Sequence, residues 1–438
     1  MSGGAYALVS KSIHRTESAA APVPALAGML ERRAWLTRLS LSEFRCYARA
    51  EIETDGRPVV LTGPNGAGKT NLLEAISFLA PGRGLRRARL SEIDRRRAGA
   101  ATNGAGNPGA VGAWAVAATV MAPGGPRELG TGREPAADGA SSESGRERRL
   151  VKIDGAFARS QQKLGEIVSM TWLTPQMDGL FRDSAGSRRR FLDRLVYGFD
   201  TAHAGRVAAY EQSLRERARL LKAGGAAPAW LDALEDSMAR HGIAIAAARR
   251  DLVDRLGRAC AVRVGGFPVA GLALNGEVDR WLGQMAALRA EEKLRESYAA
   301  ARRRDAEAGG AAAGPQRSDL AVRHVDRGMV AAECSTGEQK ALLIAIILAH
   351  ARLIALHREA APLLLLDEVV AHLDETRRAA LYDEILALGA QAWLTGTDAA
   401  VFAPLGDAAQ FLGVREAAVA AAPPPSGRGW GDAPGGLS

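Results

Sequence analysis

A glycine-rich segment near the start of the chain could bind the phosphates of a nucleotide. It lies between a predicted strand at 59–63 and a predicted helix at 70–79, and it fits the pattern GxxxxGK[ST] with the residues Gly63, Pro64, Asn65, Gly66, Ala67, Gly68, Lys69 and Thr70. Glycines let such a loop curl so that backbone N–H groups point inward at a phosphate, and the helix N-terminus adds the positive end of its dipole. The Lys69 ammonium would neutralise the β- and γ-phosphates, and the Thr70 hydroxyl would bind Mg²⁺. The segment therefore predicts a site for ATP and Mg²⁺, in which we include Asn71.

A second segment supplies two adjacent carboxylates. Residues 363–366 are all leucine and predict a strand buried on both faces, and Asp367 and Glu368 follow at its carboxyl end. Parallel α/β sheets bind ligands at that end of their strands. We expect Asp367 to hold Mg²⁺ and Glu368 to orient and deprotonate a water that attacks the γ-phosphate. A strand that merely ends in surface acids is the alternative, and the phosphate loop makes it the weaker one.

A third segment could bind an anion at the start of a helix. Ser335, Thr336 and Gly337 precede a strongly apolar stretch that predicts a helix over 338–357. A serine hydroxyl and the unpaired N–H groups of a helix start together form an anion site. A plain N-terminal capping box, made by Ser335 with Glu338, explains the same residues equally well.

The order of these segments resembles one family of ATPases. The pieces, spread over about residues 35–412, are LSLSEFRCY, GPNGAGKTNLLEAI, RRRFLDRL, GPQRSDL, CSTGEQK, LLLLDEVVAHLD and TGTD. Together they resemble the RecF family of SMC-like, ABC-type ATPases. The resemblance implies an α/β fold, in which an ABC-type P-loop ATPase head with a mixed sheet carries a mostly α-helical arm lobe. Thr336 departs from the double glycine of the usual signature, and Thr397 stands near the place where transporter ATPases carry a histidine.

The resemblance also implies roles for single residues. Ser335 and Gly337 of one copy would close on the γ-phosphate held by another copy, and Asp374 would communicate across that dimer. Gln176 would link the γ-phosphate and Mg²⁺ to the lobe below, with a plain loop glutamine as the alternative. Arg45 would approach the nucleotide, with a surface arginine as the alternative. The residues that match the remaining family positions are Asn65, Gly66, Gly68, Lys69 and Thr70 for ATP, Asp367 for Mg²⁺ and Glu368 for the hydrolytic base.

The function implied by the resemblance is ATP-dependent DNA binding in recombinational gap repair and replication-fork maintenance. ATP would drive a homodimer that clamps DNA at single-strand gaps or junctions, slow hydrolysis would release it, and RecO and RecR would be further partners. Three alternatives stay open. Another SMC-like DNA ATPase, such as an overcoming-lysogenization-defect-type nuclease, would need a C-terminal nuclease module, and a transporter ATPase subunit would need a membrane partner. A non-catalytic ATP-binding scaffold is disfavoured because Lys69, Asp367 and Glu368 are intact.

Composition changes along the chain predict its organisation. Residues 98–149 are rich in Gly, Ala, Pro and Ser and predict a flexible insertion, interrupted only by a strand at 114–121. The arm has only about 100 residues, which favours a short helical lobe over the long coiled coil of SMC proteins. The predicted units are a flexible extension at 1–33, the first part of the head at 34–198, the arm lobe at 199–305, the second part of the head at 306–416 and a disordered tail at 417–438.

Two arginine clusters could bind a phosphate backbone. A solvated surface is the ordinary explanation of such a run, but two runs on an SMC-like head also fit salt-dependent, sequence-independent binding of DNA. No aromatic residues are interleaved with the arginines, so base stacking is not indicated. The candidate DNA contacts are Arg83, Arg86 and Arg87 after the phosphate loop, and Arg188, Arg189 and Arg190 further along.

Composition bounds the class of protein. With 438 residues, 47% hydrophobic and 24% charged, the chain can bury a core, and its formal net charge of +8 permits a polyanionic partner without requiring one. The three cysteines lie far apart, which argues against a disulfide framework and a zinc site and favours the cytoplasm. No apolar run reaches the roughly 20 residues of a membrane span, so we expect no membrane association.

Overall fold

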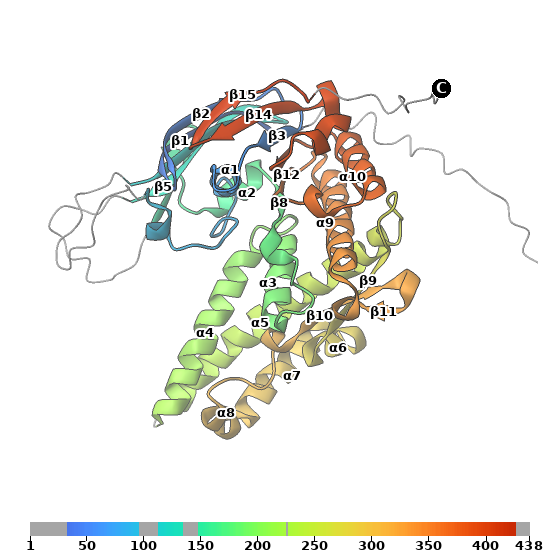
Figure 1. Ribbon diagram of the computed structural model, residues 1–438. Coiled ribbons are helices and arrows are strands. Elements are labelled where there is room, and N and C mark those ends of the chain that lie inside the picture. Colours follow the sequence, from blue (N-terminus) through green and yellow to red (C-terminus); the bar gives the residue numbers. More distant parts are fainter. Residues whose placement is uncertain (1–32, 96–112, 135–147, 225–226, 426–438) are drawn as a thin grey trace, which may run out of the picture.

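The computed structural model describes residues 33–95, 113–134, 148–224 and 227–425. Within them, two six-stranded sheets and several helices form a head, and a group of helices extends from the head as an arm (Figure 1). The predicted extension at 1–33 lies almost wholly outside the described residues. The predicted folding units stay predictions, but several of their details can be compared with the structure.

One sheet is mostly parallel and carries the nucleotide motifs. Its strand order is β15-β14-β3-β13-β12-β8, and only β15 runs antiparallel to its neighbour, so the predicted mixed sheet is confirmed. The strands are β3 (Val59–Thr62), β8 (Met170–Leu173), β12 (Leu363–Leu366), β13 (Ala392–Gly396), β14 (Gln410–Arg415) and β15 (Ala418–Ala421). The prediction of a disordered tail from 417 is wrong for β15, which pairs with β14 at the sheet edge.

The other sheet is antiparallel, in the order β2-β1-β4-β5-β6-β7. Its strands are β1 (Trp35–Phe44), β2 (Tyr47–Glu53), β4 (Ala115–Ala122), β5 (Gly125–Arg133), β6 (Arg149–Ile153) and β7 (Ala156–Phe157). The prediction of a flexible insertion at 98–149 is wrong for β5, which pairs along its length with β4 and β6. The error has a physical cause, because the ladder between neighbouring strands holds this glycine-containing segment, and a composition count does not register strand pairing. The other parts of the insertion, 98–112 and 135–147, lie outside the described residues.

Helices cover both faces of the parallel sheet. Leu363 and Leu365 join one core cluster with α1 and the antiparallel sheet, whereas Leu364 and Leu366 join another with α9 and α10. This alternation explains why the strand is apolar throughout. The helices of the head are α1 (Lys69–Ser77), α2 (Gln162–Ile167), α3 (Ala185–Val196), α9 (Thr336–Arg358) and α10 (Glu375–Leu388).

Among the described residues, α9 is long and apolar enough to cross a membrane by length and composition. In the fold it is a core helix, because 72% of its most apolar window is buried. The predicted buried helix at 338–357 is therefore confirmed.

The arm consists of helices and a small sheet. The helices are α4 (His203–Ala223), α5 (Pro228–Cys260), α6 (Glu277–Gln284), α7 (Ala287–Ala300) and α8 (Arg302–Ala308). The sheet, in the order β11-β10-β9, consists of β9 (Ala270–Asn275), β10 (Asp319–His324) and β11 (Met329–Val330). The mostly helical prediction missed β9, which pairs with β10, a strand far along the chain. Short 3-10 turns lie at Leu90–Ile93, Pro175–Met177, Pro315–Arg317, Val325–Arg327, Ala331–Glu333, Val370–His372 and Ala400–Ala408.

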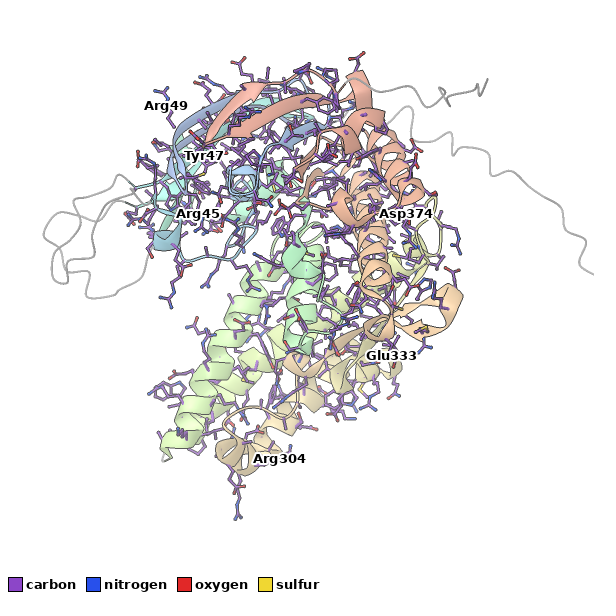
Figure 2. All side chains as sticks on the ribbon, viewed as in Figure 1. Arg45, Tyr47, Arg49, Arg304, Glu333 and Asp374 are labelled. Carbon is purple, nitrogen blue, oxygen red and sulfur yellow. The ribbon has the colours of Figure 1, made fainter. Side chains whose placement is uncertain are left out.

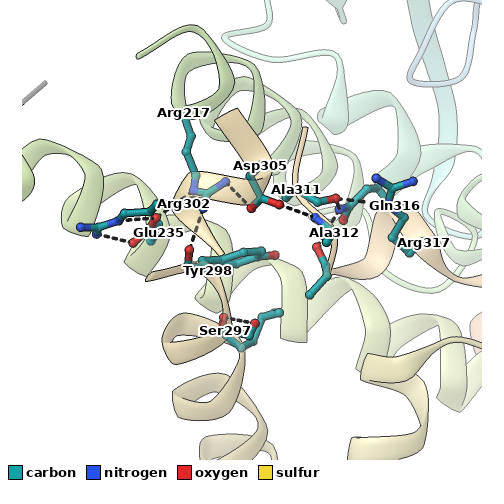
Figure 3. Close-up of polar contacts among 12 residues, drawn as sticks. Arg217, Glu235, Ser297, Tyr298, Arg302, Asp305, Ala311, Ala312, Gln316 and Arg317 are labelled. Atoms are coloured by element: carbon teal, nitrogen blue, oxygen red, sulfur yellow. Dashed lines mark hydrogen bonds and ion pairs between the residues drawn. The ribbon is translucent and has the colours of Figure 1, made fainter. Parts of the chain in front are cut away.

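A buried ion network holds the arm helices together (Figure 3). The Arg217 guanidinium donates to Glu235 at 2.8 Å, to Asp305 at 2.9 Å and to the Tyr298 carbonyl at 2.7 Å. Arg302 also donates to Glu235, through its Nε at 3.0 Å and its Nη2 at 2.5 Å. Arg217, Glu235 and Asp305 are each about 1% exposed, and with Arg302 the two cations balance the two carboxylates inside the arm.

Candidate nucleotide-binding site

The phosphate loop is shaped by glycines that no other residue could replace without strain. Gly63 has φ 152°, and a Cβ there would lie 2.1 Å from the Val414 carbonyl oxygen. Gly68 has φ 114°, and a Cβ there would lie 2.6 Å from the Tyr47 hydroxyl. A side chain at either position would collide with a neighbouring strand, so the tight turn between β3 and α1 requires glycine.

Lys69 closes the loop on itself. Its ammonium donates to the Gly63 carbonyl at 2.6 Å and to the Pro64 carbonyl at 2.9 Å. Burial lowers the pKa of Lys69, while the charges of Glu368 and Asp367 raise it. The buried ammonium therefore lies in the loop, close to both carboxylates, where a nucleotide phosphate would carry its negative charge.

Thr70 and Asp367 meet across the sheet although they are far apart in the chain. The Thr70 hydroxyl donates to Asp367 Oδ1 at 2.9 Å, and Thr395 from β13 donates to the same oxygen at 2.9 Å. Burial raises the pKa of Asp367, and the two hydroxyl bonds lower it only in part. A buried carboxylate of this kind is suited to a metal ion.

Glu368 follows at the exit of β12 in an unusual backbone conformation. Its φ is 51°, and its N–H donates to the Thr395 hydroxyl at 2.8 Å. Lys340 from α9 donates to the Glu368 carbonyl at 3.4 Å and approaches Asp178 at 3.5 Å. A left-handed glutamate is strained, and both of its backbone polar groups are held by neighbouring side chains, so the carboxylate is aimed by the main chain.

The residues present fit a magnesium ion. Mg²⁺ in nucleotide sites binds one or two protein oxygens and takes its other ligands from phosphates and water. Thr70 and Asp367 supply such a pair, with their oxygens 2.9 Å apart. Over the described part of the chain, no group of three or more His, Cys, Asp or Glu residues could hold a metal by protein ligands alone. A metal here would therefore depend on the nucleotide.

Gln176 lies at the same edge of the sheet. It belongs to the turn Pro175–Met177, directly after β8, and β8 is the parallel neighbour of β12. Its side chain is exposed. The position is compatible with the expected link to the γ-phosphate, and that role stays a prediction.

The predicted partner-facing segment caps α9. Ser335 Oγ accepts from the Glu338 N–H, and the Glu338 carboxylate accepts from the Ser335 N–H at 3.0 Å, so the capping box is real. Ser335, Thr336 and Gly337 are all exposed. A Cβ on Gly337 would meet no atom within 4 Å. The capping box is made by Ser335 and Glu338, and within this chain nothing requires glycine at position 337.

Arg45 and Arg86 do not point freely into solvent. Both pair with Glu74 of α1, which is fully buried, at 2.8 Å for Arg45 and 3.1 Å for Arg86. Arg86 also donates to Asn71 Oδ1 at 2.7 Å, and Asn71 Nδ2 contacts Cys46 Sγ. The neighbourhood of Arg45, beside α1, can be followed in Figure 2. These contacts fix the hairpin between β1 and β2 beside the phosphate loop, and nucleotide contact by Arg45 stays a prediction.

Asp374 caps another helix. Its carboxylate accepts from the Arg377 N–H at 2.8 Å at the start of α10, where Figure 2 labels it. Capping of α10 is a sufficient reason for an aspartate at position 374 within a single chain. A role of Asp374 across a dimer stays a prediction.

The arginine clusters divide into two groups. Arg188 forms a double ion pair with Asp319 at 2.7 Å, and Arg189 donates to the Ser318 carbonyl at 2.7 Å, so both tie α3 to the small sheet. Arg83, Arg87 and Arg190 have no ion pair within the described residues, and all three line one cavity. The two clusters, about 100 positions apart in the sequence, thus meet in the fold.

Sequence reasoning missed three polar residues of the site. Thr395 lies in the TGTD motif, Glu74 in GPNGAGKTNLLEAI and Lys340 in CSTGEQK, and these motifs predict no individual role for the three residues. Glu74 carried a signal that could have been used, because a carboxylate among the apolar residues of α1 must find a cationic partner. The partners of Thr395 and Lys340 come from other strands and helices, and the sequence gives no direct sign of them.

Comparison with known proteins agrees with this site. The family model described as "RecF/RecN/SMC N terminal domain" matches residues 35–416. The "DNA replication and repair protein RecF" of Allorhizobium ampelinum is 48% identical over 387 residues, which cover 88% of this chain and 98% of that protein. The protein of the same name from Rhizobium johnstonii is 45% identical over 390 residues, with 88% and 98% covered.

Solved structures show the same fold. The "Structure of the recombination mediator protein RecF-ATP in RecFOR pathway" superposes with a TM-score of 0.73 at 19% identity and covers 89% of this chain and 100% of that one. The "Structure of the recombination mediator protein RecF-ATPrS in RecFOR pathway" superposes with a TM-score of 0.73 at 18% identity. The match covers 89% of this chain and 98% of that one. The phosphate loop, the Asp367–Glu368 pair and the match over nearly the whole of the curated relatives lead to one assignment. The chain belongs to the RecF family, within the wider group of RecF, RecN and SMC proteins.

Proposed function

We propose that this chain is a DNA-binding ATPase of replication and repair, in which ATP binding drives a homodimer and slow hydrolysis releases it. The names of its relatives and the ATP in the titles of the matching RecF structures support the proposal. The observation that carries it is the meeting of Thr70 with Asp367 at 2.9 Å, beside the buried ammonium of Lys69. In P-loop ATPases, a loop Ser or Thr and an Asp after a buried strand hold the Mg²⁺ of the bound nucleotide, and the loop lysine holds its phosphates.

The nucleotide would lie on the phosphate loop. Backbone N–H groups of Asn65, Gly66 and Gly68 would face the phosphates, and Lys69 would turn from the loop carbonyls toward the β- and γ-phosphates. Thr70 and Asp367 would hold Mg²⁺, which supplies positive charge against the triphosphate when bound. Glu368 would accept a proton from the attacking water, and the backbone bonds from Thr395 and Lys340 would keep it aimed there.

A second copy would complete the site. Ser335 and Gly337 are exposed at the N-terminus of α9, and that end carries unpaired N–H groups and the positive end of the helix dipole. The open space around Gly337 supports this step, because a glycine inside a helix costs roughly 1 kcal/mol relative to alanine unless a close approach requires it. A γ-phosphate held by the partner would make that approach.

DNA would bind to the dimer without sequence readout. The formal net charge of +8 and the unpaired arginines after the phosphate loop favour a phosphate backbone. By family, the setting is gapped or junctional DNA in the cytoplasm, with RecR and RecO as further partners.

Sedimentation with ATP and Mg²⁺ tests the shared site. We expect the wild type and Glu368→Gln to dimerise with ATP, with Glu368→Gln remaining dimeric longer because it cannot hydrolyse. Lys69→Met should stay monomeric, and the wild type with ADP is the matched control. If Glu368→Gln does not dimerise at saturating ATP, the proposal is wrong.

DNA binding is tested separately. Affinity for gapped and plain duplex should be measured with and without ATP across a salt series, with wild type and Lys69→Met side by side. We expect ATP to strengthen binding by the wild type only, and affinity to fall steeply with salt. If ATP strengthens DNA binding by Lys69→Met as much as by the wild type, the proposed coupling between nucleotide binding and DNA binding is wrong.

A further inference from the structure

A cavity of about 720 Å³ lies between the head and the arm, apart from the phosphate loop. Its walls come from the segment 81–87 after α1, from the end of β8, and from α3 and α4. Gln176, at the carboxyl edge of the parallel sheet, also lines it. The volume falls within the usual range of small-molecule sites, about 300–1,000 Å³.

The lining of this cavity has an excess of unpaired cations. Arg83, Arg87, Arg190 and Arg194 all line it, and none of them has an ion pair within the described residues. Arg83, Arg87 and Arg190 are exposed, whereas Arg194 is half-buried and its guanidinium lies 4.7 Å from the centre of the Trp172 ring. The polar contacts of Arg194 are long, at 3.4 Å to the Trp172 carbonyl and 3.4 Å to Met177 Sδ. A guanidinium normally gathers more and shorter acceptors than these.

The acids of the cavity do not balance these charges. Asp193 is already held by His203 at 2.8 Å and by both arms of Arg249 at 2.8 Å. Glu211 has its ion pair with Arg215 at 3.7 Å, on the exposed side of α4. Asp183 is the other carboxylate of the lining, and it makes no ion pair with any of the four arginines. Within the described residues, none of these three acids therefore forms an ion pair with the four arginines.

Electrostatics of the arginines agrees with this geometry. Desolvation by burial lowers the pKa of Arg87, the nearby charges of Arg190 and Arg83 lower it further, and Tyr197 and Glu211 raise it in part. Burial lowers the pKa of Arg194 to about 9, with Arg87 as the second cause. Charges that repel one another in this way are relieved by a bound anion.

Two further observations point to a ligand. The indole Nε1 of Trp172 is buried without any hydrogen-bond partner, although Trp172 is only 7% exposed and lines the cavity. A buried donor without an acceptor is costly, and an anion in the cavity could supply the acceptor. Arg87 has φ 58°, a left-handed conformation that an arginine adopts only under constraint.

We infer that this cavity binds a phosphate ester, with the phosphoryl group held by the arginines and the attached sugar and base in the remaining space. Arginine recognises phosphate through paired N–H bonds, and the four guanidinium groups and the Trp172 indole are all donors. The ester is either a free nucleotide or the end of a nucleic acid strand, because both present the same phosphoryl chemistry. Neither ligand requires ATP hydrolysis or a dimer; a strand end would rest on the proposed DNA binding by the same arginines, whereas a free nucleotide goes beyond the proposed function.

Calorimetric titration of the full chain with thymidine 5′-monophosphate tests the site, with thymidine as the ligand that lacks the phosphate. The double variant Arg87→Gln/Arg190→Gln removes two unpaired cations without breaking an ion pair. The control double variant Arg303→Gln/Arg304→Gln removes the same charge from the arm, where the side chain of Arg303 is 95% exposed and Arg304 projects outward (Figure 2). Lys69→Met distinguishes this cavity from the phosphate loop.

We expect the wild type to bind the monophosphate and not thymidine. Affinity should fall roughly tenfold or more in Arg87→Gln/Arg190→Gln and stay unchanged in the control double variant and in Lys69→Met. All variants should keep the thermal midpoint of the wild type. Absence of binding by the wild type, equal weakening in the control, or loss confined to Lys69→Met would each overturn the inference, and none of these depends on ATP-driven dimerisation.

Competition identifies the source of the phosphate. A 5′-phosphorylated oligonucleotide that displaces the monophosphate better than its 5′-hydroxyl counterpart would identify a strand end as the ligand. If neither oligonucleotide displaces the monophosphate, the ligand is a free nucleotide. Both results require phosphate-dependent binding in this cavity.

Discussion

The Thr395 hydroxyl donates to Asp367 Oδ1 at 2.9 Å, and the same oxygen of Thr395 accepts from the Glu368 N–H at 2.8 Å. One side chain from β13 thus sets the rotamer of the predicted metal ligand and the strained backbone of the predicted base. Thr395 is 1% exposed, so water cannot replace it in either bond. We regard Thr395 as a positioning residue for both carboxylates.

Replacing Thr395 by valine should lower ATPase activity roughly 10–100-fold, the usual effect of removing a group that orients a metal ligand. The Mg²⁺ concentration for half-maximal activity should rise, because Asp367 would lose an orienting bond while ATP contacts on the loop remain. Thr395→Ser keeps the hydroxyl and is the matched control. Activity is measured by phosphate release over a Mg²⁺ series. A loss in Thr395→Val without any shift in Mg²⁺ dependence would contradict the positioning role.

Replacing Gly337 by glutamine should separate stability from assembly. The substitution should stabilise the monomer by roughly 0.5 kcal/mol, because a good helix former replaces glycine where the chain leaves open space. It should also abolish ATP-dependent dimerisation, because a side chain would stand where the partner's phosphate approaches. Chemical unfolding and sedimentation measure the two effects.

Gly257 is the matched control for that substitution, since it is also a helical glycine with open space around its Cβ. Gly257→Gln should give a similar gain in stability and dimerise normally. Dimerisation by Gly337→Gln at wild-type strength would show that Gly337 does not face a partner.

Replacing Arg217 by alanine should destabilise the arm by roughly 3–5 kcal/mol, because Glu235 and Asp305 would stay buried without their shared cation. Hydrogen exchange should rise first in α4 and in the helices that Arg217 joins to it, α5, α7 and α8. Arg219→Ala is the control, since that side chain is 65% exposed and pairs only within its own helix. Its effect should stay within about 0.5 kcal/mol. If Arg217→Ala and Arg219→Ala lower the free energy of unfolding equally, the buried ion network stabilises the arm no more than an exposed ion pair does.

His350 should make the head sensitive to acid. It lies between Thr171 and the Leu195 carbonyl in the core, and burial lowers its pKa from 6.5 to about 4. The unfolded chain therefore takes up a proton at a higher pH than the folded chain does. The contribution of neutral His350 to the free energy of unfolding is fully present above pH 6.5. It falls by roughly 3 kcal/mol as the pH decreases toward about 4. Urea unfolding at several pH values should show this slope in the wild type and lack it in His350→Gln, whereas the same slope in both would assign it to other groups.

Much of the nucleotide site was predictable because each motif is local. The glycines of the phosphate loop, Lys69 and Thr70 form one turn, and Asp367 and Glu368 follow one strand, so spacing and strand–helix context suffice to predict their chemistry. The apolar runs of β12 and α9 likewise predicted buried elements, since burial on all sides requires apolar side chains. Resemblance to the RecF family then supplied the order of the elements and the expectation of a shared site.

Tertiary structure decided how distant groups combine. The strand β5 forms because β4 and β6 pair with it, although its own composition suggests a loop. Arg86 and Arg87 both line the cavity, but Arg86 pairs with buried Glu74, whereas Arg87 has no ion pair within the described residues. Thr395 becomes a partner of Asp367 only because β13 and β12 are adjacent and parallel. Such contacts depend on distances between elements, which a sequence fixes through the packing of the whole chain and not through any local pattern.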